Sequence, residues 1–202
     1  MVGAGGHARS CIDVIEQDGR FSVAGLVGLP NEVGMYMYGH PVLGSDTDLP
    51  SLVREFSCAL VALGQIKTPD LRIRLFEMLR GYGCDLPTIV SPHAYVSQHA
   101  SVGEGTIVMH GAIINAGARI GRNCIINSRA LIEHDAVIDD HCHVATAAVI
   151  NGNVSVGEGS FIGSNACIRQ GVNIGVRGFI NMGEKVFSDW SGNFSASDGN
   201  PQ

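Results

Sequence analysis

The segment from Asn127 to Asp135 contains residue types that could perform acid–base chemistry. His134 stands between two carboxylates, Glu133 and Asp135, and Asn127 precedes them in the same segment. A carboxylate beside an imidazole raises its basicity and holds it in one tautomer, which suits a general base. A solvated turn would carry the same residues, so the segment alone leaves both interpretations open.

A second candidate lies at the start of the chain, where residues 2–8 read Val-Gly-Ala-Gly-Gly-His-Ala ahead of a helical pattern. Gly3, Gly5 and Ala8 fit a loose G-x-G-x-x-A fingerprint, in which backbone N–H groups and a helix N-terminus face a phosphate. A tight turn without a ligand also fits. A nicotinamide cofactor is disfavoured, because the unit is small and no clear acidic residue follows at a strand end.

Metal binding is a third possibility. His141 and His143 are two residues apart, and His110 and His134 are 24 residues apart. Position 139, where a further ligand would be needed, is an aspartate. Three histidines in a plausible zinc geometry cannot be assembled from these positions, so no metal site is predicted.

The elements that would position these residues are defined by a repeat. Every sixth residue from Val90 to Val186 is Ile or Val, seventeen times without a miss. The residue two places earlier is nearly always small: Ala94, Ala100, Thr106, Ala112, Ala118, Cys124, Ala130, Ala136, Cys142, Ala148, Ser160 and Ala166. A period of six matches neither an α-helix nor a flat strand. It predicts a solenoid.

Each hexad can supply one short strand and one corner, so three hexads close a coil of about eighteen residues around the branched side chains. Positions 103, 121, 139, 157 and 175 read Gly, Gly, Asp, Gly and Gly at that spacing, which predicts a corner with positive φ there. In such a three-sided prism His134 is expected on the outer surface, near a corner.

Residues 1–85 have a different pattern and predict a small parallel α/β unit, Rossmann-like, with strands and helices in alternation. We expect a helix that fades by Gly19, a strand over 21–27, a loop over 30–40, a short helix over 46–56, a strand over 58–64 and a helix capped by Thr68. The predicted domains are therefore 1–85, a coil domain over 86–187, and an irregular tail over 188–202. Trp190 and Phe194 of that tail could cap the open end of the prism.

Composition narrows the function classes. The net charge is −6 with no basic run, which argues against nucleic acid as a partner. No apolar stretch is long enough to span a membrane, and the first thirty residues lack a signal-like block, so a cytoplasmic location is expected. Six cysteines without a CxxC pair predict reduced thiols.

The hexad pattern resembles the hexapeptide-repeat (left-handed β-helix) family, most of whose members are acyltransferases. The glycine turn with His7, the α/β unit and the segment from Asn127 to His134 look like one subfamily. It comprises bacterial sugar acetyltransferases, including sialic acid O-acetyltransferases and N-acetyltransferases of nucleotide-linked amino sugars. The resemblance covers roughly residues 1–186 and implies a left-handed β-helix that assembles as a homotrimer.

The resemblance also implies residue roles, with acetyl-CoA as co-substrate. His134 would be the base, assisted by Asp135 or Glu133. The substrate would be held by the glycine turn and by one residue of the prism: Gly5, Gly6, His7 and Asn127. Acetyl-CoA would lie in a groove between prisms, near His143, Gly152 and Ser164.

Two places depart from the subfamily pattern. Residues 28–30 read Gly-Leu-Pro where many members carry an Asp-Asp pair that grips the nucleotide base, and residues 199–202 read Gly-Asn-Pro-Gln where Gly-x-Pro-Ala is usual. The expected activity is acetyl-CoA-dependent N-acetylation of a UDP- or GDP-linked deoxysugar in surface glycan biosynthesis. The alternatives are O-acetylation of a sialic-acid-like sugar and a non-catalytic trimeric scaffold.

Overall fold

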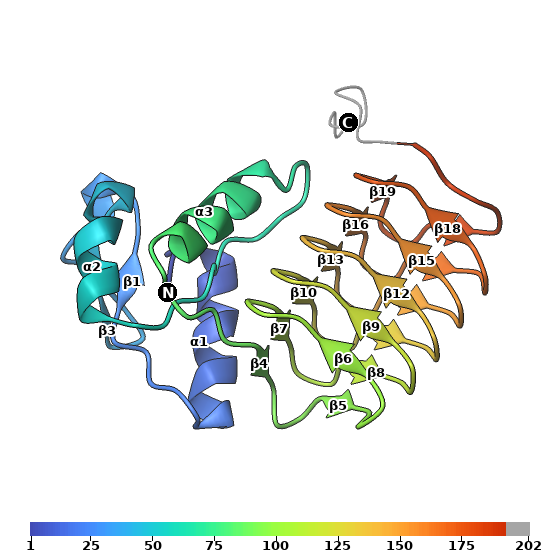
Figure 1. Cartoon of the computed structure of the whole chain (residues 1–202), viewed down its shortest axis with the longest axis horizontal. Coiled ribbons are helices and arrows are strands. Elements are labelled where there is room, and N and C mark those ends of the chain that lie inside the picture. The colour runs from blue at the N-terminus through green and yellow to red at the C-terminus, as the bar shows by residue number, and fades with distance from the viewer. Residues whose placement is uncertain (193–202) are drawn as a thin grey trace.

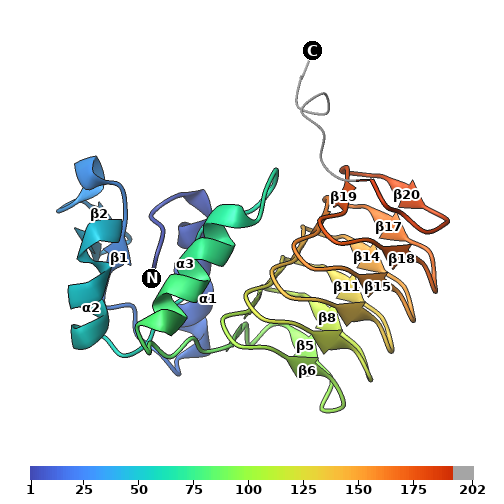
Figure 2. The same cartoon turned by 45° about the horizontal axis from the view of Figure 1, so that its top comes forward.

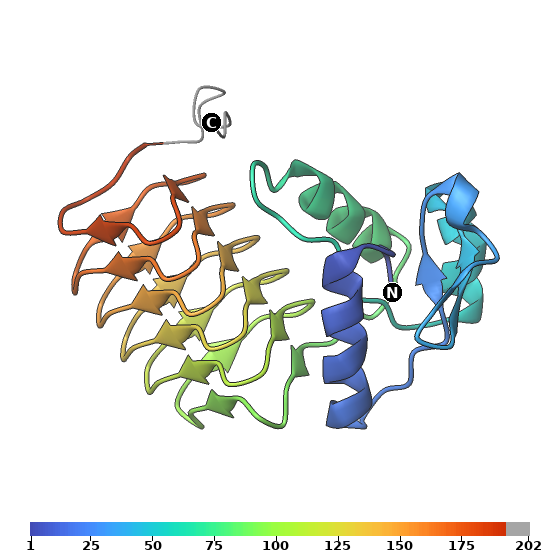
Figure 3. The same ribbon diagram turned by 180° about the vertical axis from the view of Figure 1, so that it is seen from behind.

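The computed structural model of the chain describes residues 1–192. An α/β unit precedes a prism of stacked coils, and helices α1 (Gly6–Asp18) and α3 (Asp70–Gly81) lie between the sheet of that unit and the prism (Figure 1). Seen from behind, α1 runs beside the first strand of the prism (Figure 3). The α/β unit is therefore packed against one face of the prism.

The prism consists of two-residue strands separated by four-residue turns (Figure 2). Its strands are β4 (Ile89–Val90), β5 (Tyr95–Val96), β6 (Ser101–Val102), β7 (Ile107–Val108), β8 (Ile113–Ile114), β9 (Arg119–Ile120), β10 (Ile125–Ile126), β11 (Leu131–Ile132), β12 (Val137–Ile138), β13 (His143–Val144), β14 (Val149–Ile150), β15 (Ser155–Val156), β16 (Phe161–Ile162), β17 (Cys167–Ile168), β18 (Asn173–Ile174), β19 (Phe179–Ile180) and β20 (Lys185–Val186).

In the described residues these strands form three parallel sheets. The first sheet contains β4, β7, β10, β13, β16 and β19, the second runs from β5 to β20, and the third from β6 to β18. Each strand pairs with the strand eighteen residues further on, as Ile125 does with His143. The predicted three-sided coil is confirmed.

The core of the prism is the column of Ile and Val side chains that the hexads predict. From Val108 to Val186 these side chains are buried, together with the small residues that precede them, such as Ala112 and Cys124. Only the first coil, at Val90, Val96 and Val102, is partly exposed. Burial of a continuous apolar column is what stabilises each coil on its neighbours.

One expectation about the corners is wrong. Positive φ falls at another position of the hexad, in a series from Gly105 to Gly183 that includes Asp135 and His141. Gly121, predicted to need it, does not have positive φ. An added Cβ at Gly121 would instead lie 2.6 Å from the backbone nitrogen of Asp140 in the next coil. Glycine is required there because the coils approach closely, and not because the backbone turns left-handed.

The α/β unit contains β1 (Leu26–Val27), β2 (Tyr36–Met37), β3 (His40–Gly44) and α2 (Leu49–Glu55), with short 3₁₀ turns at 30–32 and 46–48. β1 pairs in parallel with β3, and β2 pairs antiparallel with β3. Val2 bridges in parallel to Val27 and to Val61. The strands are thus shorter than predicted, and β2 and β3 begin within the region predicted to be a loop.

The ends of the predicted elements are partly as expected. Helix α1 ends at Gly19, whose φ of 70° is left-handed. The hydroxyl of Thr68 accepts a hydrogen bond from the Asp70 backbone nitrogen at 3.2 Å, at the start of α3. Trp190 bridges to Ile174 and packs against the prism core, so it does cover the last coil. Phe194 and the rest of the tail lie outside the described residues.

No helix within residues 1–192 is long and apolar enough to cross a membrane. All six cysteines are free thiols.

Candidate active site

His134 lies on the turn between β11 and β12, at the corner where the second sheet meets the third. Its side chain is half exposed, as the sequence predicts. The Nδ1 atom lies 2.9 Å from Oδ2 of Asp135. Because a carboxylate only accepts, Nδ1 carries the proton and the lone pair of the ring is on Nε2. His134 therefore presents the nitrogen that a general base needs.

Only one of the two flanking carboxylates contacts the imidazole. Asp135 occupies a left-handed position with φ of 59°, which directs its side chain back to His134. Glu133 points to the preceding coil instead, where its Oε2 accepts a hydrogen bond from Asn115 Nδ2 at 3.0 Å. Of the two predicted assisting residues, Asp135 is the one placed to orient His134.

Gly152 lies in the next coil at the position equivalent to His134. An added Cβ there would be 2.5 Å from His134 Nε2 and 2.6 Å from Cε1, so the ring rests against this glycine. Gly152 was predicted to lie beside acetyl-CoA in the groove between prisms. In the structure it contacts His134, the predicted base.

Asn127 and His143 meet at a different corner, where the first sheet turns into the second. Asn127 Oδ1 accepts a hydrogen bond from the Ser128 backbone nitrogen at 2.7 Å, which fixes the orientation of its amide. Asn127 Nδ2 is then the donor to His143 Nε2, at 3.3 Å. Ser164 lies in the equivalent turn two coils further on, between β16 and β17.

The surroundings of His143 decide its protonation. Its Nδ1 donates to the backbone oxygen of Gln65 at 2.5 Å, so Nε2 is an acceptor in the neutral ring. Burial lowers the pKa of His143 from 6.5 to about 4, although the Gln65 hydrogen bond opposes that shift. A neutral ring whose Nε2 already accepts from Asn127 cannot donate to an oxyanion. In this arrangement His143 supplies no hydrogen-bond donor for the oxyanion of an acyl transfer.

The glycine turn leaves open space where a ligand could approach. Gly5 is the N-cap of α1, and its first turn contains no acidic residue. Added Cβ atoms at Gly5 and Gly6 would meet nothing within 4 Å. At Gly3 the opposite holds, because φ is 120° and an added Cβ would lie 2.9 Å from Leu63 Cδ1. The turn thus packs tightly on one side and exposes helix N–H groups, which favour anions, on the other.

His7 follows this turn and points inward. Burial lowers the pKa of His7 to about 3, with smaller contributions from the charges of Arg72 and His143. Its Nε2 is buried and has no hydrogen-bond partner among the described residues. His7 is therefore neutral and lies close to the Asn127–His143 corner.

The predicted site residues consequently form two groups in one chain. One group lies at the first sheet and at its corner with the second sheet, and it comprises the glycine turn, Asn127, His143 and Ser164. The other group, His134 and Gly152, lies at the next corner of the prism. The structure also adds Gln65, which lies in a loop without a motif and therefore could not be selected from the sequence. Its backbone oxygen binds His143, and its Nε2 donates to the backbone oxygen of His141 at 2.9 Å.

The histidines considered for metal have other partners. His141 Nδ1 accepts a hydrogen bond from Asn123 Nδ2 at 2.9 Å, and its ring lies edge-on to Phe76. His110 contacts Ser91 and Asp13. Between residues 1 and 192, no three His, Cys, Asp or Glu side chains are arranged to hold a metal ion.

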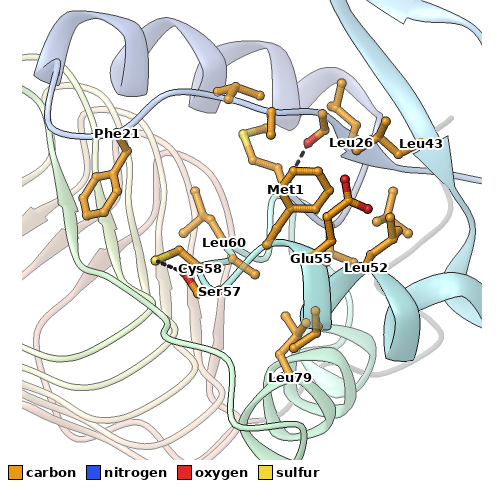
Figure 4. A pocket seen from close by; sticks show the side chains of 18 of the residues that line it. Met1, Phe21, Leu26, Leu43, Leu52, Glu55, Ser57, Cys58, Leu60 and Leu79 are labelled. Carbon is orange, nitrogen blue, oxygen red and sulfur yellow. Dashed lines mark hydrogen bonds between the residues drawn. The ribbon is translucent and has the colours of Figure 1, made fainter.

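A cavity of about 350 Å³ opens at the opposite end of the α/β strands from the glycine turn (Figure 4). Apolar side chains such as Leu26, Leu52 and Leu79 line it, with Glu55 and Cys58 at the same opening. None of the predicted site residues borders this cavity.

Comparison with known proteins identifies the two parts of the chain. Residues 1–79 match the family described as the PglD N-terminal domain, and residues 99–134 match the bacterial transferase hexapeptide family. A search of curated proteins gave no match.

Solved structures match over nearly the whole chain. Perosamine N-acetyltransferase from Caulobacter crescentus, a mutant in complex with CoA and GDP-perosamine, is 35% identical with a TM-score of 0.87, covering 94% of this chain and 88% of that one. The acetyltransferase domain of PglB from Neisseria gonorrhoeae, in complex with acetyl coenzyme A, is 29% identical with a TM-score of 0.85, covering 94% and 90%. WeeI from Acinetobacter baumannii, 20% identical with a TM-score of 0.71 over 92% and 95%, shares the fold. The chain belongs to the hexapeptide-repeat sugar acetyltransferases, and its prism is a left-handed parallel β-helix.

Proposed function

We propose that this protein transfers the acetyl group of acetyl-CoA to an amino group on a nucleotide-linked deoxysugar, as a step in surface glycan biosynthesis. The observation that carries the proposal is His134, half exposed at a prism corner with Nδ1 held by Asp135. The likeness to perosamine N-acetyltransferase supports N-acetylation and an enzyme over a scaffold. We also propose that the protein acts in the cytoplasm, where it would meet both acetyl-CoA and the nucleotide-linked sugar.

The proposed reaction needs no covalent enzyme intermediate. The amine nitrogen attacks the thioester carbonyl carbon, and Nε2 of His134 takes the proton that the nitrogen loses. Asp135 stabilises the imidazolium that forms. Collapse of the tetrahedral intermediate breaks the C–S bond, and the CoA thiolate leaves and recovers the proton from His134. Holding both substrates in one groove supplies much of the rate.

We propose that the working enzyme is a homotrimer with its sites between chains. The two groups of site residues lie at different corners of one prism, so His134 of one chain would have to meet the glycine turn and Asn127 of a neighbour. Acetyl-CoA would lie along the shared groove, beside His143, Gly152 and Ser164. A tetrahedral oxyanion there would be stabilised by a backbone N–H, because neutral His143 is an acceptor.

The structure also has a carboxylate near the position where the nucleotide base is expected to bind. Gly28 follows β1, and an added Cβ at Gly28 would lie 2.7 Å from Glu32 Oε2 and 3.2 Å from the Cβ of Ala4 in the glycine turn. Guanine presents two adjacent donors to a carboxylate. Oε2 of Glu32 already accepts a hydrogen bond from the Leu29 backbone nitrogen at 2.7 Å, which holds the carboxylate at this turn. We propose that this carboxylate, in place of the absent Asp-Asp pair, favours a GDP-linked sugar over a UDP-linked one.

The first test is the replacement of His134. His134→Ala should lower kcat/KM by about 10²–10⁴-fold in an acetyl transfer assay with a GDP-linked amino sugar, because general-base catalysis is lost. The exposed His99 lies at the same corner of the prism, two coils before His134, and provides the matched control His99→Ala, which should keep full activity. A folded His134→Ala enzyme that loses less than tenfold would refute the assignment.

An acceptor panel tests the type of transfer. The amino sugar and its hydroxyl counterpart, compared at equal acetyl-CoA, should differ strongly in favour of the amine, because an amine that is partly neutral near pH 7 needs less help from the base. Preference for the hydroxyl would establish the O-acetyltransferase alternative instead.

A further inference from the structure

Arg72 is a buried cation without a carboxylate partner. It lies in α3, it is 2% exposed, and it forms no ion pair among the described residues. Its Nη1 donates to the backbone oxygens of Val61 at 2.9 Å and Leu63 at 2.5 Å. Its Nη2 donates to Asn123 Oδ1 at 2.8 Å and to the Asn123 backbone oxygen at 3.2 Å, while Nε has no partner.

Such a group is costly to keep in a folded protein. Burial lowers the pKa of Arg72 to about 10, so the guanidinium is still charged at neutral pH. Buried charges are normally paired, because the desolvation of an isolated ion is not recovered by hydrogen bonds to neutral carbonyls alone. The uncompensated charge therefore calls for an explanation beyond packing.

The position of Arg72 suggests what balances the charge. Val2 bridges in parallel to Val61, so Leu63, whose oxygen binds the guanidinium, lies level with Ala4 in the glycine turn. His7, which follows the turn, is close enough that the charge of Arg72 contributes to its lowered pKa. Arg72 thus lies directly behind the turn.

The turn itself is built to receive an anion. Helix α1 has thirteen residues, and its first turn contains no acidic side chain. The space beyond Gly5 and Gly6 is open. Gln65, also 2% exposed, leaves its Oε1 without a partner in the same region and holds the adjacent loop on the prism.

We propose that Arg72 is a positioning residue that supplies a fixed positive charge behind the glycine turn and thereby binds the diphosphate of the nucleotide sugar. This inference rests on the proposed function and adds the residue whose charge selects a diphosphate ligand. Arg72 acts through its field, since its buried side chain is separated from the ligand by the turn. A purely structural role, holding Val61, Leu63 and Asn123 together, makes a different prediction.

The test compares ligands of different charge in the full-length protein. Calorimetry would measure the binding of GDP, GMP and guanosine to Arg72→Lys, Arg72→Met and the wild type. Arg74→Met is the matched control, because Arg74 is an exposed residue of the same helix. Circular dichroism and the thermal midpoint report whether each variant folds.

If Arg72 acts through its charge, Arg72→Met should weaken the binding of GDP more than the binding of guanosine. Arg72→Met should weaken GDP binding by about tenfold or more, as expected for losing an opposite charge close to the ligand, and guanosine binding by less than about threefold. Arg72→Lys keeps the charge and should retain the GDP-to-guanosine affinity ratio within about threefold. If Arg72→Met does not fold, the ratio in Arg72→Lys decides alone.

Two results would overturn the inference. One is an equal loss for all three ligands in Arg72→Met, and the other is a collapsed GDP-to-guanosine ratio in a folded Arg72→Lys. Failure of the proposed function would look different: the wild type itself would bind neither GDP nor UDP, whatever stands at position 72.

Discussion

The imidazole of His134 depends on a glycine one coil away. Because an added Cβ at Gly152 would come within 2.6 Å of two ring atoms, Gly152→Ala should push the ring from its place on Asp135. We expect kcat/KM to fall by about 10–100-fold, since small displacements of a catalytic group are costly. The prism should stay folded, because the contact is with an exposed side chain. Gly81→Ala is the control, as nothing lies within 4 Å there. Full activity of Gly152→Ala would show that the ring position is unimportant.

The free energy of unfolding should decrease at acidic pH, because the junction between the α/β unit and the first sheet contains His143. His143 bonds Gln65 and Asn127 as a neutral ring, and burial lowers its pKa from 6.5 to about 4. Its contribution to stability is therefore complete above pH 6.5 and is lost as the pH falls toward 4. The loss is on the order of 3 kcal/mol. Urea unfolding between pH 7 and 4 should show this slope, reduced in His143→Asn and unchanged in His99→Asn. An equal slope in all three proteins would contradict it.

The whole enzyme should behave as an assembly of composite sites. We expect a mass three times the 21.3 kDa of one chain. His134→Ala removes the base, and Gly6→Asp places a carboxylate where the substrate phosphate should bind, at a helix N-terminus that tolerates it structurally. Each variant alone should lose most of its activity. Trimers reassembled at random from equal amounts of the two variants should regain about one quarter of wild-type activity, because each site draws on two chains. No recovery in verified mixed trimers would place the whole site in one chain.

The hexad pattern by itself determined that residues 90–186 form a three-sided prism of stacked coils. Each Ile or Val buries against the equivalent residue in the adjacent coil, so the fold repeats a local rule that a single sequence displays. The same rule placed His134 outside the prism, and the structure confirms that location while its role stays a prediction. The helices at 6–18 and 70–81 were also predictable, because their apolar periodicity and end signals are local.

Other features required the tertiary structure. Which carboxylate holds His134 depends on the left-handed turn at Asp135, and the proton position on His143 depends on Gln65, 78 residues away. β3 is formed from a segment rich in Gly and Pro, and only pairing with β1 and β2 makes it a strand. The charge of Arg72 behind the glycine turn also has no sequence signal. Packing between coils repeats at a fixed spacing and can be recognised in the sequence, whereas contacts between the α/β unit and the prism occur once and depend on how the two parts meet.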